Sequence, residues 1–238
     1  VSRSAAAVVY SSAIGEANPE LAAAREGGIP ILHRSDLLKR LLDIKKGIAV
    51  AGSHGKTSVA AQLSWMLEEG GCRAGFAIGG IVPQLDGNGR WGEGDLMVVE
   101  ADESDGTFRK YNPFMELITG IDLDHFNFYE SEKDLLAAFS AFVKRLDGEG
   151  KLVINEETAG LWELAGECPS VISYGFSPGA DYRAVNIHLS GIDGGEYILE
   201  KGGEMLGEIR TTLPGRCGIV NNLAAAAAAI ELGAGFNT

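Results

Sequence analysis

The 238-residue sequence is poor in cysteine and in positive charge, and it has no long apolar run. Its three cysteines, Cys72, Cys168 and Cys217, are far apart and odd in number. That argues against a disulfide framework or a zinc site and favours a reducing compartment, the cytoplasm. No stretch reaches the ~20 apolar residues that a bilayer-spanning helix needs, so membrane insertion is not expected. The net charge of −13 argues against a nucleic-acid-binding surface, because phosphate neutralisation needs clustered lysine and arginine.

The chain does contain a regular alternation of apolar, strand-like runs with helical patterns. Strand-like runs occupy residues 7–13, 29–32, 47–52, 95–104, 115–125, 151–155 and 170–175. Helices are predicted at 18–28 with Asn18 as N-cap, 35–44 with Ser35 as cap, 56–71, 131–148, near 156–166 and at 221–233. Short strands joined by glycine-rich turns follow residue 181. This order predicts an α/β fold, with a mostly parallel sheet, helices on both of its faces, and a small antiparallel sheet near the C-terminal end.

A glycine-rich loop, Gly-Ser-His-Gly-Lys-Thr at residues 52–57, lies between a predicted strand and a predicted helix. In that arrangement the loop N–H groups and the positive end of the helix form a cradle for phosphate. Lys56 would reach the β- and γ-phosphates of a nucleotide, and the Thr57 hydroxyl would ligate Mg²⁺. Val50 stands at the first glycine of the usual G-x-x-x-x-G-K-[ST] pattern. A nucleotide site is favoured, with a chance strand–loop–helix turn as the alternative.

Two groups of polar residues, most of them acidic, follow later strands. They lie at the end of the sheet where ligands bind in open α/β folds. The first group contains Glu100, Asp102, Glu103 and Asp105, and the second contains Asp122, Asp124 and His125. These carboxylates can supply the oxygen ligands that Mg²⁺ needs beyond Thr57. The alternatives are a solvated acidic loop for the first group and a structural histidine for the second. His54, inside the loop, is either a contact to phosphate or substrate or a bystander.

These motifs, taken in order, resemble those of the Mur ligase family. The family loop G-[TS]-x-G-K-[TS] stands here as GSHGKT. The other matching segments are SSAIGEANPELAAAREGGIPILHRSDLL (11–38), IGGIV (78–82), EADESDGTF (100–108), IDLDHFNFY (121–129), SYGFSPGADYRA (173–184) and LPGRCGIVNNLAAAAAA (213–229). The resemblance covers essentially the whole chain.

The resemblance implies two domains. Residues 1–46 would be the end of a Rossmann-like N-terminal domain that binds the UDP substrate, and residues 47–238 would be the central ATP-binding domain. The family's glycine-rich start would precede Val1 and its C-terminal ligase domain would follow Thr238, so this fragment alone is expected to be inactive. One segment departs from the family. Cys217 and Gly218 stand where His-Asn is common, near the adenine, although Asn221 is retained.

The resemblance also implies a set of site residues. ATP would be bound by Gly52, Ser53, His54, Gly55, Lys56, Thr57, Ser58 and Asn221. Mg²⁺ would be held by Thr57, Glu100 and His125, and the catalytic residues would be Lys56, Glu100 and His125. The UDP substrate would contact Asp102, Ser104 and Asp105.

Within the family, the histidine of the loop is typical of two members. One joins L-alanine to the lactyl carboxylate of UDP-N-acetylmuramate, through an acyl phosphate, in the cytoplasmic synthesis of bacterial peptidoglycan precursors. The other is the murein peptide ligase, which uses a preformed peptide and carries a tyrosine where Ser104 stands, so the first is favoured. Two further alternatives are a non-catalytic nucleotide-binding fragment and another P-loop enzyme, a small-molecule kinase or a GTPase. The GTPase is disfavoured because the sequence has no N-K-x-D motif.

Overall fold

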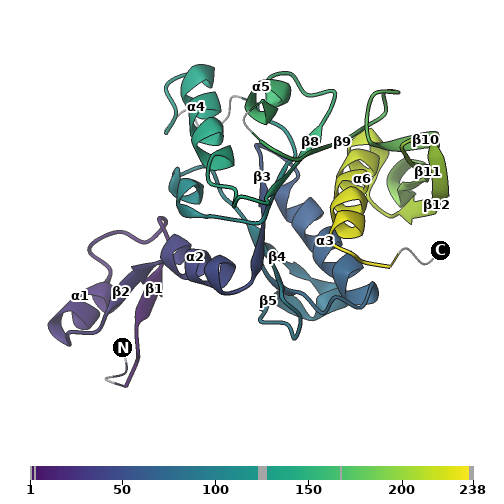
Figure 1. Ribbon diagram of the computed structural model, residues 1–238. Helices are drawn as coiled ribbons and strands as arrows, with labels where there is room; N and C mark the ends of the chain where they lie inside the picture. Colours follow the sequence, from purple (N-terminus) through teal and green to yellow (C-terminus); the bar gives the residue numbers. More distant parts are fainter. Residues whose placement is uncertain (1, 3, 123–127, 167, 236–238) are drawn as a thin grey trace.

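The computed structural model describes residues 2, 4–122, 128–166 and 168–235, and Figure 1 shows its ribbon. The strands are β1 (Val8–Tyr10), β2 (Ile31–His33), β3 (Lys46–Ala51), β4 (Gly75–Val82), β5 (Gly87–Arg90), β6 (Leu96–Glu100), β7 (Met115–Ile118), β8 (Lys151–Asn155), β9 (Val171–Gly175), β10 (Tyr182–Leu189), β11 (Gly195–Lys201) and β12 (Glu204–Thr211). The α-helices are α1 (Pro19–Glu26), α2 (Arg34–Ile44), α3 (Lys56–Glu69), α4 (Glu132–Val143), α5 (Leu161–Ala165) and α6 (Gly215–Glu231). Short 3₁₀ turns are η1 (Pro83–Leu85), η2 (Thr107–Lys110) and η3 (Gly191–Asp193).

The main sheet has the strand order β12-β11-β10-β9-β8-β7-β3-β6-β4-β5. Strand β3 is central and pairs in parallel with β6 on one side and with β7 on the other. The chain therefore visits β4, β5 and β6 on one side of β3 before it enters β7 on the opposite side. The carboxyl ends of β3, β6 and β7 meet where the order reverses, which is the position where open α/β sheets bind ligands.

The predicted α/β class is confirmed, including the antiparallel strands after residue 181. Strands β10, β11 and β12 pair antiparallel with one another, and β10 also pairs in parallel with β9 through Tyr182 and Arg183. The antiparallel strands therefore extend the main sheet. At the opposite edge, β5 pairs antiparallel with β4.

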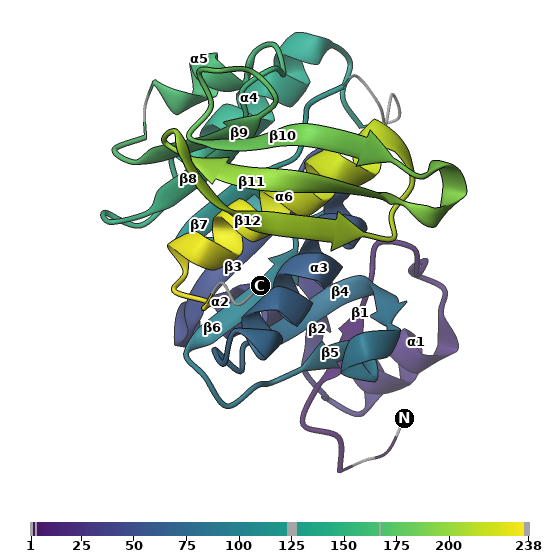
Figure 2. The same ribbon diagram turned by 90° about the vertical axis from the view of Figure 1, so that its right-hand side faces the viewer.

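Helices cover both faces of the sheet, as predicted. Helices α3 and α6 pack on one face, and Figure 2 shows α6 lying behind β10, β11 and β12. Helices α2, α4 and α5 cover the other face. The side chains of β3 alternate accordingly: Ile48 and Val50 face α3 and α6, whereas Ala49 and Ala51 face the opposite layer. All four residues have no exposed surface, as expected for a central strand that is covered on both sides.

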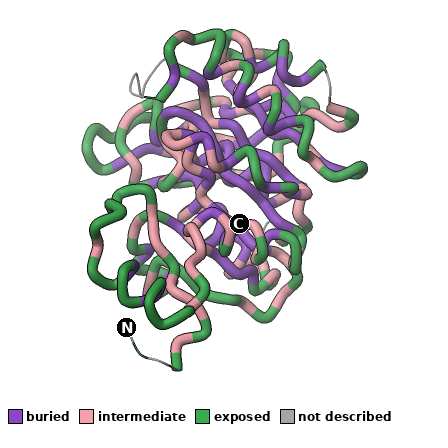
Figure 3. Tube along the Cα trace, turned by 90° about the vertical axis from the view of Figure 1, so that its left-hand side faces the viewer, coloured by how far each residue is buried: buried purple, intermediate pink, exposed green. Residues whose placement is uncertain are grey.

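Residues 4–33 form a small N-terminal unit, in which β1 and β2 pair in parallel and α1 connects them. Asn18 caps α1 as predicted, since its side chain accepts hydrogen bonds from the N–H groups of Glu20 and Leu21. Figure 3 shows that most of this unit is exposed, whereas the buried trace follows the main sheet and its helices. Helix α2 leads from the unit to the main sheet, where Leu38 and Leu42 are buried.

Several boundaries differ from the sequence-based prediction. Strands β4 and β5 have no counterpart in the prediction, because glycines interrupt both segments. Helix α6 begins at Gly215 rather than at residue 221, despite the poor helix propensity of glycine. Helix α2 is capped by His33 rather than by Ser35. The Nδ1 atom of His33 accepts from the Ser35 N–H, and the Asp36 carboxylate accepts from the His33 N–H.

Candidate nucleotide site

The glycine-rich loop follows β3 directly and ends where α3 begins. Gly52 and Gly55 both have positive φ angles, 125° and 81°, which side chains with a Cβ atom rarely adopt. Space is also restricted, because a Cβ atom on Gly52 would lie 2.4 Å from Thr119 Oγ1. A Cβ atom on Gly55 would lie 2.7 Å from Asn221 Oδ1. Both glycines are therefore required by the close approach of β7 and α6 to the loop.

Hydrogen bonds attach the loop to the segment that follows β7. The Ser53 hydroxyl donates to the Asp122 carbonyl over 2.8 Å and accepts from the Asp122 N–H over 2.9 Å. The Ser53 N–H donates to the carbonyl of Gly120, and the Thr119 hydroxyl donates to the carbonyl of His54. The Ser53 side chain is thus occupied by backbone groups, while the His54 side chain is exposed. The loop is therefore joined to residues 119–122 by several hydrogen bonds.

Lys56 lies in the first turn of α3 and its ammonium group is turned back over the loop. Its Nζ atom donates to the carbonyl of Gly52 over 2.7 Å. It also lies 3.0 Å from Oε1 and 2.9 Å from Oε2 of Glu103. The Glu103 side chain has no exposed surface, and that of Lys56 is 13% exposed. A buried ion pair therefore closes one side of the phosphate cradle.

Thr57 and Glu100, two of the predicted magnesium ligands, lie in contact with each other. The Thr57 hydroxyl donates to Oε1 of Glu100 over 2.8 Å, and Oε2 of Glu100 accepts from the Gly79 N–H over 2.8 Å. Two ligands at adjacent corners of an octahedral Mg²⁺ site with bonds of about 2.1 Å lie about 3 Å apart. The spacing of these two oxygens matches that geometry.

No group of three or more histidine, cysteine, aspartate or glutamate side chains that could hold a metal occurs among the described residues. Mg²⁺ bound with a nucleotide needs no such group, because it takes one or two protein oxygens together with phosphate oxygens and waters.

The acidic segment after β6 faces the N-terminal unit. One carboxylate oxygen of Asp105 accepts a hydrogen bond from the Ser12 hydroxyl and lies 4.0 Å from Nε2 of His33. Arg34 lies 3.7 Å from the Asp102 carboxylate. Burial works against ionisation of Asp105, but hydrogen bonds from Ser12 and Thr107 outweigh it and hold the pKa of Asp105 below its ordinary value. The predicted substrate residues Asp102 and Asp105 thus connect the two parts of the chain.

Helix α6 closes the loop from the other side. Its Asn221 lies against Gly55, and the next residue, Asn222, donates from Nδ2 to Oε1 of Gln62 on α3 over 2.6 Å. A Cβ atom on Gly218 would lie 2.3 Å from the Leu213 carbonyl oxygen, so the backbone leaves no room there for a side chain. Cys217 is exposed in the first turn of the same helix.

The structure brings together most of the residues that the sequence singles out. The loop, the first turn of α3 with Ser58, the end of β6 with Glu100, and Asn221 meet at the carboxyl edge of the sheet. Ser104, whose N–H donates to Asp102, lies on the adjacent acidic segment. The predicted metal ligand His125 lies outside the described residues, and so does Asp124.

The contacts of two residues were not predicted from the sequence, which names Glu103 only as one of four candidate oxygen ligands and does not name Thr119. Glu103 is one of the four carboxylates after β6, but its pairing with Lys56 joins positions 47 residues apart, for which the sequence carries no periodic signal. Thr119 carries no motif of its own, and its contact with the loop follows only from the pairing of β3 with β7.

Comparisons with known proteins match most of the chain to one family. The model for the Mur ligase middle domain matches residues 50–229, and the model for the Mur ligase family catalytic domain matches residues 1–46. A UDP-N-acetylmuramate–L-alanine ligase of Carboxydothermus hydrogenoformans is 39% identical over 230 residues, which are 96% of this chain and 49% of the relative. The corresponding ligase of Stenotrophomonas maltophilia strain K279a is 42% identical over 228 residues, covering 95% and 48%. The chain thus spans about half the length of the curated relatives it matches.

Solved structures have the same fold. The UDP-N-acetylmuramate-alanine ligase MurC of Thermotoga maritima has a TM-score of 0.78 at 27% identity, covering 95% of this chain and 51% of that one. A UDP-N-acetylmuramate:L-alanyl-γ-D-glutamyl-meso-diaminopimelate ligase of Neisseria has a TM-score of 0.79 at 24% identity, covering 94% and 74%. In the described part of the chain, no helix has both the length and the apolar character needed to cross a bilayer.

Proposed function

The chain belongs to the Mur ligase family, and from this premise we propose that it provides the nucleotide-binding part of an ATP-dependent ligase that joins L-alanine to UDP-N-acetylmuramate. Members of the family are ATP-dependent ligases, so ATP is the expected nucleotide. The curated relatives at about 40% identity carry the name of the L-alanine-adding enzyme. The division into a partial substrate-binding domain at residues 1–46 and an ATP-binding domain at 47–238 is part of the proposal.

One observation carries the proposal: Lys56, Thr57 and Glu100 converge beside the glycine-rich loop at the point where the strand order reverses. The loop and the first turn of α3 present backbone N–H groups to the triphosphate, and the lysine adds positive charge. Ser53 and Thr119 keep the loop in shape through their contacts with the backbone. Asn221 packs against the loop from α6.

Thr57 and Glu100 would hold a magnesium ion, and His125 stays a predicted third ligand. When bound, Mg²⁺ neutralises charge on the phosphate oxygens. Glu100 is prepared for this role because the Gly79 N–H orients its second oxygen, leaving Oε1 toward Thr57.

The proposed reaction joins a carboxylate to an amine at the expense of ATP. The lactyl carboxylate of UDP-N-acetylmuramate attacks the γ-phosphorus, the bond to the β-phosphate oxygen breaks, and an acyl phosphate and ADP form. The deprotonated amine of L-alanine then attacks the acyl carbon and phosphate leaves, which gives the amide. The main obstacle in the first step is repulsion between two anions, so positive charge at the meeting point is the principal contribution of Lys56 and the loop.

The UDP substrate would approach from the N-terminal unit. Residues of β1, α1 and the start of α2, including Tyr10, Asn18 and Arg34, line a hollow in that unit. Arg34 also pairs with Asp102 of the acidic segment. A substrate bound beside Arg34 would therefore lie next to the segment that leads from Glu100. This adjacency supports the assignment of Asp102, Ser104 and Asp105 as substrate contacts.

The test is phosphate release from MgATP by the complete natural protein, with UDP-N-acetylmuramate, in the presence and absence of L-alanine. We expect release that requires both substrates and a UDP-muramoyl-alanine product identified by mass. The matched control is the Lys56→Ala variant, which should release no phosphate under either condition. Release that requires a preformed peptide in place of L-alanine would point to a murein peptide ligase. Release that ignores both substrates would point to another P-loop enzyme.

A further inference from the structure

We propose that Glu103 is the counter-ion of Lys56 in the nucleotide-free protein and that ATP binds by taking this lysine away from it. The inference rests on the proposed nucleotide site. Glu103 would be a positioning residue whose negative charge opposes nucleotide binding. Nothing in the reaction assigns it a role, although it is the most deeply buried carboxylate of the acidic segment.

The hydrogen-bonding capacity of Lys56 is the first argument. An ammonium group has three N–H donors. In the structure Nζ donates to the Gly52 carbonyl over 2.7 Å and to Oε1 of Glu103 over 3.0 Å, and Oε2 of Glu103 lies 2.9 Å from it as part of the ion pair. The ammonium group is thus held by protein oxygens on the loop and on the acidic segment. Drawing it toward a phosphate oxygen competes with these contacts.

The burial of the pair is the second argument. The Glu103 side chain is fully enclosed and that of Lys56 is 13% exposed, so water screens their attraction only weakly. When the ammonium moves toward phosphate, the carboxylate loses its close contact with Lys56. Losing the attraction between Lys56 and Glu103 therefore weakens the net affinity for the nucleotide.

The attachment of Glu103 shows which partner has to move. Its own carbonyl accepts from the Tyr129 hydroxyl over 2.7 Å and from the Gly106 N–H over 2.9 Å. Its neighbours Asp102 and Asp105 are held by the N-terminal unit. The carboxylate thus stands on a segment fixed at several points, whereas Lys56 has a long, flexible side chain. ATP binding therefore separates the pair by movement of the lysine.

The proposal predicts that removing the charge of Glu103 strengthens the binding of nucleotide. Replacing Glu103 by glutamine keeps the size of the side chain and an oxygen acceptor for Lys56, but removes the competing charge. The Glu103→Gln variant should bind MgATP about tenfold more tightly than the parent, since loss of one buried charge pair commonly changes affinity by this order. The gain should shrink from ATP to ADP to AMP, and adenosine should be unaffected. General damage to the fold would weaken binding.

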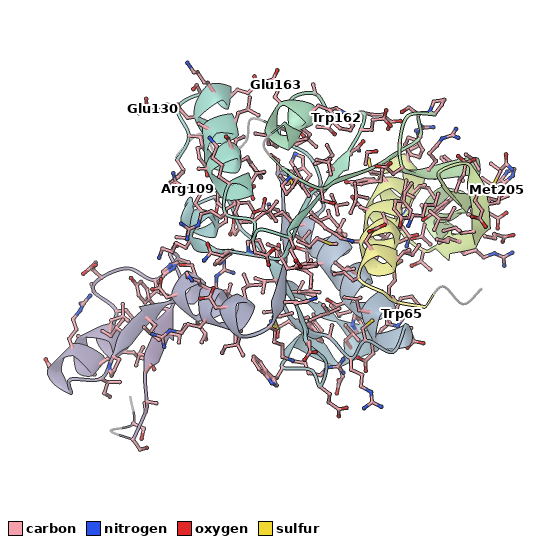
Figure 4. The ribbon with its side chains drawn as sticks, in the orientation of Figure 1. Trp65, Arg109, Glu130, Trp162, Glu163 and Met205 are labelled. Carbon is pink, nitrogen blue, oxygen red and sulfur yellow. The ribbon has the colours of Figure 1, made fainter. Side chains whose placement is uncertain are left out.

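The experiment is titration calorimetry of the 238-residue chain with MgATP, ADP, AMP and adenosine. The matched control is Glu163→Gln, which makes the same charge change on an exposed residue of α5, far from the loop (Figure 4). A second variant, Glu103→Asp, withdraws the carboxylate from Lys56 by one methylene. It should shift affinity in the same direction by a smaller factor, and it remains informative if Glu103→Gln fails to fold.

The outcomes separate this inference from the proposed function. Tighter binding by the Glu103 variants, with Glu163→Gln equal to the parent, supports the counter-ion role. Equal or weaker binding by folded Glu103 variants, in a chain whose parent binds MgATP, overturns the counter-ion role and leaves the nucleotide site standing. Absence of MgATP binding by the parent and all variants overturns both.

Discussion

The carboxyl edge of the sheet and its interior each enclose a glutamate with no exposed surface, but the two side chains have different surroundings. At the edge, Glu103 has the ammonium group of Lys56 at 2.9–3.0 Å. In the interior, Glu116 lies on β7 between Ala49 of β3 and Leu152 of β8. Within the described residues, neither carboxylate oxygen of Glu116 has a hydrogen-bond partner.

The effect of burying a carboxylate depends on whether a cation lies beside it. Burial alone raises the pKa of Glu116 well above its ordinary value, which favours its neutral form, and its oxygens place unsatisfied polar atoms in an apolar layer. Glu103, by contrast, has the ammonium group of Lys56 beside it. The first glutamate is expected to lower the stability of the fold, whereas the second is the ion-pair partner of Lys56.

The largest effect is expected at the edge. The Lys56→Ala variant should bind MgATP about 100-fold more weakly, because it loses the charge-assisted contact with the phosphates. It should also lower the free energy of unfolding by about 3 kcal/mol, because Glu103 stays buried without its ammonium partner. Calorimetry measures the first effect and urea denaturation the second.

The double variant Lys56→Ala/Glu103→Gln sharpens this prediction. Removing the buried charge of Glu103 as well should recover most of the lost stability but none of the lysine's contribution to affinity. A single variant as stable as the parent would contradict the importance of the ion pair. A double variant less stable than the single one would contradict it too.

A smaller effect of opposite sign is expected in the interior. The Glu116→Leu variant fills a similar volume without polar atoms and should raise the free energy of unfolding by about 2 kcal/mol. The parent should also lose stability as pH rises above 4.5, the ordinary pKa, because the folded state then binds more protons than the unfolded one. Urea denaturation between pH 5 and 9 measures both effects.

The Glu116→Gln variant is the matched control for the interior. The glutamine is neutral at every pH but still polar. The decrease in the free energy of unfolding that Glu116 causes as pH rises should therefore vanish, while the stability itself should increase only a little. Equal pH dependence in the parent and in this variant would show that the interior glutamate is not protonated in the folded protein.

The smallest effect on stability is expected at the C-terminal end of α6, where a third glutamate, Glu231, accepts several hydrogen bonds. Glu231 accepts hydrogen bonds from Lys151, Tyr182 and Lys201. Burial opposes its ionisation, but these bonds prevail and lower the pKa of Glu231 to about 2. Its contribution is present above pH 4.5 and is lost as pH falls through about 2, which is the reverse of Glu116.

The Glu231→Gln variant should cost about 1 kcal/mol at pH 7, since the group is partly exposed and solvent screens its ion pairs. Its unfolding should depend less on pH between 5 and 2 than that of the parent. Acid titrations followed by circular dichroism compare the two proteins. Parallel acid transitions would exclude Glu231 as a source of acid sensitivity.

The parts of the fold that local sequence controls were predictable. The spacing of Gly52, Gly55 and Lys56 specifies a strand–loop–helix unit, and Asn18 followed by proline specifies a helix start, because both signals act within a few residues. The glycines of β4 hide its strand character, since glycine lacks the side chain that gives a strand its alternation. The start of α6 was missed for a related reason, because Gly215 and Gly218 have low helix propensity and only tertiary packing makes that turn helical.

The candidate site was predictable in composition but not in its internal contacts. Lys56, Thr57 and Glu100 follow from motifs at strand ends, and the structure brings them together. The partnership of Lys56 with Glu103 depends on how the segment after β6 folds back over the loop. No pattern of residue types specifies that path. The same is true of Ser53, whose type suggests a phosphate contact but whose hydroxyl is occupied by the backbone of Asp122.

The position of α6 has a consequence for how the protein is made. Gln62, one turn beyond the phosphate loop, is bonded to Asn222, and the two residues are 160 positions apart. A ribosome adding about 5–20 residues per second needs roughly 8 to 30 s to travel that distance. Throughout that interval α3 has been synthesised but lacks the helix that covers it, so its apolar face is available to chaperones. The loop acquires Asn221, its neighbour at Gly55, only after a similar interval. The two sides of the nucleotide site are therefore translated far apart in time.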